Sequence, residues 1–102
     1  MARSQTELTE RLKGLDEDYE YMVYYQPPSK MLFPCIKFQR NNSWDSRADN
    51  ILYFFMKRYS VTVIDRDPDS ALPDKVEAMP FAAFDRFDLV DGLNHWVYNL
   101  YY

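Results

Sequence analysis

The side chains best suited to chemistry are one histidine, one cysteine and a few closely spaced aspartates. His95 is the only histidine and Cys35 the only cysteine. Catalysis or metal binding by either would need convergent partners, and the sequence places none beside them. We therefore expect His95 to pack or hydrogen-bond on a strand. We expect Cys35, next to Pro34 in an apolar run, to be a buried structural thiol.

Three aspartates at alternate positions, Asp65, Asp67 and Asp69, resemble the start of a calcium-binding loop. Such a loop also needs a glycine at its sixth position and a glutamate at its twelfth. Here those positions hold Ser70 and Val76. We expect the aspartates instead to cap a helix, because carboxylates favour its positive N-terminal end. The sequence predicts no metal, no cofactor and no catalytic residue.

The segment Asp85-Arg86-Phe87-Asp88 could suggest a paired-carboxylate site. Strand alternation would direct Asp85 and Arg86 to opposite faces, and Asp88 to the face of Arg86. We therefore expect a solvated strand face here.

The composition limits the remaining functions. A length of 102 residues predicts one domain, residues 1–102. Nine tyrosines in a chain that is 18% aromatic suit protein interfaces. With two glycines there is no glycine-rich phosphate loop, and a net charge of −4 without a basic stripe disfavours nucleic-acid binding. No signal peptide and no apolar run of roughly 20 residues is present, so no membrane association is expected.

The hydrophobic pattern predicts two short helices and five strands. Leu8, Leu12 and Leu15 form one stripe of an amphipathic helix over residues 4–15. A second helix is expected from Asp67 or Ser70 to Met79. Strands are predicted at residues 21–26, 31–40, 51–65, 83–89 and 95–102. The order α-β-β-β-α-β-β predicts an α+β fold, in which both helices pack on one side of a mainly antiparallel sheet.

Turn residues predict how the strands connect. Pro27 and Pro28 are expected to lie in the turn of a hairpin that joins the first two strands. Asp91-Gly92 is expected to form the turn of a hairpin that joins the last two. Pro34 indicates an edge position or a bulge. The residues expected in the core are Phe33, Ile36, Phe38, Tyr59, Val61, Val63, Leu72, Val76 and Trp96.

The polar segment 41–50 is the expected exposed loop. It contains Trp44 and Arg47, residue types enriched among interface hot spots. The alternative for Trp44 is that it folds back and caps the sheet.

Five segments of the sequence together resemble the small tail terminator proteins of long-tailed bacteriophages, which are also labelled tail completion or minor capsid proteins. The resemblance covers nearly the whole chain. Its most specific part is Val-Ile-Asp-Arg-Asp-Pro-Asp-Ser at positions 63–70. The segments are residues 33–40, 48–50, 58–70, 84–87 and 93–95.

The resemblance implies a structural virion protein and not an enzyme. Such subunits close into a homo-oligomeric ring, typically a hexamer, which caps the tail tube protein and presents a face to the head completion or connector protein. Genomic DNA passes through the lumen without specific binding, and an acidic chain suits that conduit. The implied location is the tail-neck region of the virion, with the host cytoplasm during assembly.

Two alternatives remain open from the sequence. One is a head-side neck or stopper protein. The other is a monomeric protein-binding module, of the inhibitor or antitoxin type, that recognises one protein through its tyrosine-rich sheet. The residues expected at subunit or tube contacts, chosen by exposure and type, are Arg40, Trp44, Arg47, Asp49, Asn50, Tyr53 and Arg66.

Overall fold

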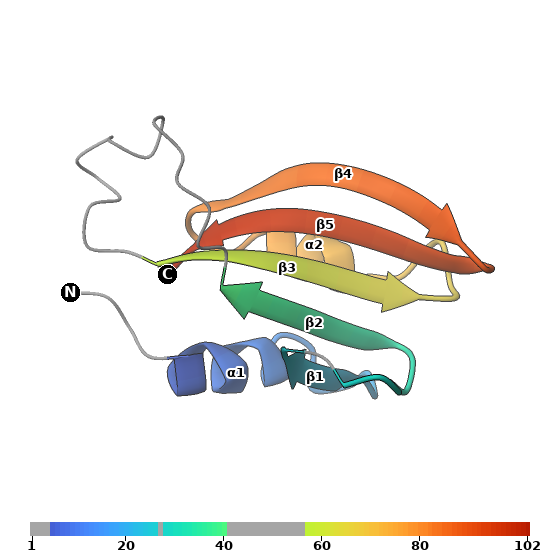
Figure 1. Cartoon of the computed structure of the whole chain (residues 1–102), viewed down its shortest axis with the longest axis horizontal. Coiled ribbons are helices and arrows are strands. Elements are labelled where there is room, and N and C mark those ends of the chain that lie inside the picture. Colours follow the sequence, from blue (N-terminus) through green and yellow to red (C-terminus); the bar gives the residue numbers. More distant parts are fainter. Residues whose placement is uncertain (1–4, 27, 41–56) are drawn as a thin grey trace.

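The computed structural model describes residues 5–26, 28–40 and 57–102. These residues form the predicted α+β fold, with five strands and two short helices in the order α-β-β-β-α-β-β (Figure 1). The elements are α1 (Gln5–Lys13), β1 (Met22–Tyr25), β2 (Cys35–Arg40), β3 (Arg58–Asp65), α2 (Leu72–Glu77), β4 (Ala82–Val90) and β5 (Leu93–Tyr101).

The strands form one sheet in the order β1-β2-β3-β5-β4, so β1 and β4 are its two edges (Figure 1). Three of the pairings, β2 with β3, β3 with β5 and β5 with β4, are antiparallel. The pairing of β1 with β2 is parallel, with Met22 opposite Cys35 and Tyr25 opposite Phe38. The predicted hairpin between these two strands is therefore wrong.

Proline explains both this error and the late start of β2. The sequence predicts a strand from position 31, but β2 begins at Cys35, directly after Pro34. Because proline has no N–H group to donate, the segment before Cys35 makes a poor ladder partner. The chain uses that segment to return to the starting end of β1. There the Met22 N–H donates to the Pro34 carbonyl at 3.1 Å.

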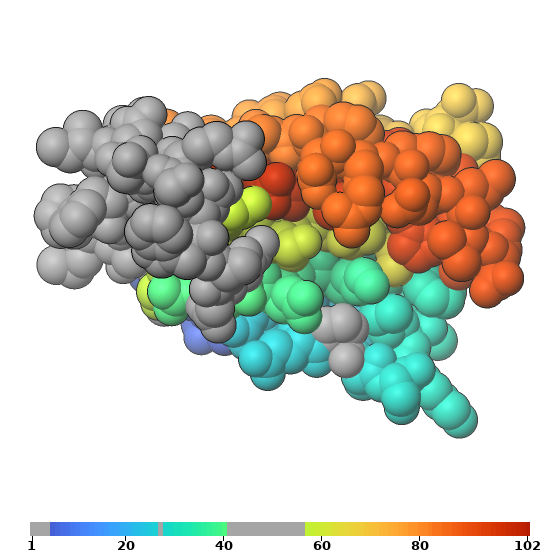
Figure 2. All heavy atoms as spheres, turned by 45° about the horizontal axis from the view of Figure 1, so that its top comes forward, coloured from blue at the N-terminus to red at the C-terminus, as the bar shows by residue number. Residues whose placement is uncertain are grey.

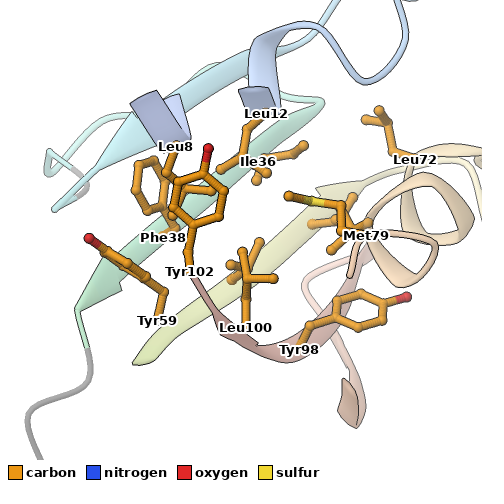
Figure 3. Close-up of a cluster of buried hydrophobic side chains, with 13 residues drawn as sticks. Leu8, Leu12, Ile36, Phe38, Tyr59, Leu72, Met79, Tyr98, Leu100 and Tyr102 are labelled. Atoms are coloured by element: carbon orange, nitrogen blue, oxygen red, sulfur yellow. The ribbon is translucent and has the colours of Figure 1, made fainter. Parts of the chain in front are cut away.

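Both helices cover the same face of the sheet and share one core (Figure 3). Leu8 and Leu12 point from α1 toward Ile36 and Phe38, as their helical spacing predicts. Burial of each such side chain contributes about 1.5–3 kcal/mol to the free energy of unfolding. Of the residues expected in the core, those confirmed as buried are Ile36, Phe38, Tyr59, Val61, Val63, Leu72 and Val76.

Two expected core residues, Phe33 and Trp96, are only half-buried. Trp96 packs against the margin of the core cluster. Phe33 lies before β2 begins, where the Arg66 guanidinium carbon is 5.9 Å from the centre of its ring. Their hydrophobicity alone therefore does not predict how deeply the two side chains are buried.

The start of α2 differs from the predicted aspartate cap. Its N-cap is Ala71, which makes no side-chain cap hydrogen bond, and a proline occupies its first turn as expected. The aspartates form successive turns instead: Asp65 accepts from the Asp67 N–H at 3.0 Å, and Asp67 from the Asp69 N–H at 2.9 Å. These side chains therefore shape the approach to the helix.

In the described part of the chain, no helix is both long and apolar enough to cross a bilayer.

Candidate interaction surface

The edge strand β4 presents the main apolar surface among the described residues. Phe84, Phe87 and Leu89 are 49%, 47% and 64% exposed, although they alternate with polar residues as in a half-buried strand. In Figure 2 the side chains of β4, in orange, occupy the surface along one border of the sheet. A contiguous apolar row of this kind indicates a protein-binding surface.

The hairpin to β5 holds β4 at the border of the sheet. Asp91 and Gly92 have φ angles of 54° and 76°, which is the backbone of the tight turn that Asp-Gly favours. Val90 pairs with Leu93 across the turn, so this predicted hairpin is confirmed. On the helix side, the Tyr98 hydroxyl donates to the Pro73 carbonyl at 3.0 Å, so α2 is anchored over β5. The outer part of β4 extends beyond that cover.

Each exposed ring of β4 rests on a ring of β5. Phe84 lies edge-on to Tyr98 with centroids 5.6 Å apart, and Phe87 is tilted on Trp96, also at 5.6 Å. These pairs are also direct cross-strand partners. Such contacts typically add about 0.5–1.5 kcal/mol each and hold the rings in fixed positions. The surface is therefore preorganised, with one side of each ring left to solvent.

A bulge interrupts β4 at Asp85, because the register with β5 shifts between Phe84 and Arg86. Arg86 Nη1 lies 2.8 Å from an Asp85 carboxylate oxygen, and Arg86 Nε lies 3.4 Å from Asp88. The prediction that Asp85 and Arg86 face opposite ways is therefore wrong, since their charged groups meet. All three side chains are well exposed, so their pairing contributes about 0–1 kcal/mol to stability. Together the three side chains form an exposed row of alternating charge along β4.

A second group of polar side chains surrounds the buried carboxylate of Asp65. Its Oδ2 accepts from the Tyr19 hydroxyl at 2.6 Å, while Asn94 Nδ2 donates to the Asp65 carbonyl at 3.1 Å. The hydrogen bond to Asp65 and, to a smaller extent, burial raise the pKa of Tyr19 to about 12. These hydrogen bonds hold the chain in place at the end of β3. In residues 5–26, 28–40 and 57–102, no group of three potential metal ligands comes together.

The lone cysteine and histidine have packing roles, as predicted. Cys35 is fully buried, and burial raises the pKa of its thiol to about 11. His95 is half-buried, and its Nδ1 lies 3.1 Å from the Leu93 carbonyl oxygen. The thiol is therefore protonated at neutral pH and poorly suited to nucleophilic attack.

The residues predicted at contacts do not coincide with β4. Arg40 is exposed at the end of β2, and Arg66 is exposed over the Phe33 ring. The other predicted contact residues, Trp44, Arg47, Asp49, Asn50 and Tyr53, lie outside the described residues. The sequence signal that could have identified β4 is the run Phe-Asp-Arg-Phe followed by a tight turn, since a strand ending in a terminal hairpin can reach the edge of a sheet.

No protein family, curated protein or solved structure matches this chain.

Proposed function

We propose that this chain is a phage tail terminator, a structural subunit that closes into a ring, caps the tail tube and joins it to the head connector. The observation that carries the proposal is the apolar, preorganised row on β4, at one edge of a sheet whose other edge, β1, is quite different. A ring needs a heterologous interface, in which one patch meets a different patch on the next copy. Two unlike edges on opposite sides of one sheet supply such a pair.

The two edges differ in length and character. The outer strand β4 has nine residues and exposed rings, whereas β1 has four residues and follows the acidic stretch that ends at Glu20. An edge strand carries backbone N–H and C=O groups that can pair with another chain. We propose that the neighbouring subunit or the tube protein covers β4 in the assembled neck. The acidic balance of the chain suits a lumen through which DNA passes without being held.

The same edge also favours a second candidate, a monomeric binding module. A partner can add a strand to an open sheet edge, with its side chains fitting between exposed rings. In that case β4 would bind one protein target, and no ring would form.

The decisive experiment uses the virion. Negative-stain images of particles made without this protein should show tails of uncontrolled length, or tails never joined to heads. Normal joined virions would refute the proposal.

A variant test then connects the function to β4. Complementation with Phe87→Asp should fail to restore capped, joined tails, because a carboxylate would replace an outward ring. The matched control is Lys75→Asp, which introduces the same carboxylate at an exposed position of α2, away from both sheet edges. We expect Lys75→Asp to complement, and equal behaviour of the two variants would dissociate capping from β4.

A further inference from the structure

The outer strand β4 is complementary to itself when two copies run antiparallel. Its centre reads Phe84-Asp85-Arg86-Phe87, an aromatic, an acid, a base and an aromatic. If Phe84 of one copy is placed opposite Phe87 of a second, Asp85 faces Arg86 of that copy and Arg86 faces its Asp85. Every charge at the centre then meets its opposite, and every ring meets a ring.

The bulge makes this alignment possible on the correct faces. In a regular strand, residues three positions apart lie on opposite faces of the sheet. Yet Phe84 pairs with Tyr98 and Phe87 with Trp96, which lie two positions apart on β5 and so share a face. The extra residue at Asp85 brings both rings to the helix-covered side. The face pattern of β4 is therefore symmetric about its midpoint.

The charged residues Arg86 and Asp88 occupy the other face of β4. Arg86 pairs with Val97 and Asp88 with His95, partners that again lie two positions apart on β5. The Asp85 carboxylate reaches Arg86 at 2.8 Å. A twofold axis beside the middle of β4 thus places each ring opposite a ring and Asp85 opposite Arg86.

The ends of the strand fit as well. In this register Ala82 faces Leu89 of the second copy, and Ala83 faces its Asp88. Each large side chain meets a small one, and no like charges are opposed. By contrast, the four-residue β1 of a neighbour would cover at most about half of β4, so in free solution a second β4 covers more of this edge.

We infer that two free copies of this chain pair through β4 about a twofold axis and form one continuous sheet. A twofold contact is complete with two copies, so it cannot build a cyclic ring. In the pair the apolar edge of the free protein is covered. The inference concerns the free protein and does not depend on the proposed role in the phage neck.

Sedimentation of the full chain over a wide concentration range tests this inference. The unmodified protein should sediment as a dimer. Asp85→Arg should be monomeric, because arginines would oppose each other twice across the axis, and Arg86→Asp should be monomeric because aspartates would do so. An equimolar mixture of the two variants should restore a dimer, since each arginine of one chain would then face an aspartate of the other.

The controls separate pairing from folding and from general charge. Asp85 and Arg86 have exposed side chains, so the circular dichroism of both variants should equal that of the unmodified chain. The Glu10 carboxylate on α1 is exposed and lies 3.9 Å from Lys13. Glu10→Lys reverses this charge, and the variant should remain dimeric. A monomeric unmodified protein, a single variant that stays dimeric, or a mixture that stays monomeric would overturn the inference. A ring in free solution would overturn it too, while supporting the proposed function.

Discussion

The strands β3 and β4 belong to one sheet and are separated only by β5, yet they have opposite surroundings. Both sequences alternate apolar and polar residues. In β3 every residue from Val61 to Asp65 is buried, whereas in β4 every residue after Ala82 is exposed. The place of a strand in the sheet, rather than its pattern, therefore decides its burial. β3 and its neighbours therefore form the buried core, whereas β4 leaves an apolar edge exposed.

The boundary between these regions runs along β5. Its Leu100 and Tyr98 lie in the core beneath the helices (Figure 3). Its Trp96 is half-buried and supports a ring of β4. Equivalent substitutions on the two sides of this boundary should have very different effects.

The largest contrast should come from one leucine on each side. Leu100→Ala, at a fully buried position, should lower the free energy of unfolding by about 2–5 kcal/mol, because it removes apolar contacts and leaves a cavity. Leu89→Ala, at a position 64% exposed, should change it by no more than about 0.5 kcal/mol. Urea unfolding measures both, and losses of similar size would remove the distinction between core and edge.

A smaller contrast should appear between polar contacts. Tyr19→Phe removes the hydroxyl that donates to buried Asp65 and should cost about 1–3 kcal/mol in the free energy of unfolding. Arg86→Ala breaks two exposed ion pairs of β4 and should cost about 0–1 kcal/mol. The same urea measurement applies. If Arg86→Ala proves the more damaging, the charge row of β4 contributes to stability and not only to recognition.

High pH should lower the free energy of unfolding through Tyr98, which lies on the core side of this boundary. Burial raises the pKa of Tyr98 to about 12, above the usual value near 10. A raised folded-state pKa means that the contribution to stability is complete below about pH 10 and is lost as the pH rises toward 12. Tyr98→Phe should therefore lose less stability over this interval than the unmodified chain in parallel urea titrations. An unchanged slope would mean that Tyr98 ionises freely in the folded protein.

The smallest contrast between paired variants is expected at the turn that carries β4. Gly92→Ala should cost about 1 kcal/mol, because φ is +76° there although no atom crowds the new methyl group. Gly14→Ala, at the end of α1, should be nearly neutral because an added methyl group would meet only ordinary contacts there. Thermal unfolding of the two variants gives the comparison. A neutral Gly92→Ala would show that the β4 hairpin tolerates another turn.

Much of the fold was predictable because it depends on local pattern. The leucine spacing of α1, the proline in the first turn of α2 and the Asp-Gly turn each favour one local conformation, and all three predictions are confirmed. The buried positions of β2 and β3 follow from the same alternation. Of the predicted contact surface, the structure describes Arg40 and Arg66, both exposed, but it does not test their role.

What the sequence determined by itself was the set of elements and the order in which the chain makes them, because helix and strand periods are encoded within a few residues. Tertiary structure decided that β1 and β2 run parallel, that the outer part of β4 is exposed and that its bulge aligns Phe84 with Phe87 on one face. These features depend on which strands meet and on where two short helices stop covering the sheet. Such contacts join residues far apart in the chain, so no local pattern specifies them.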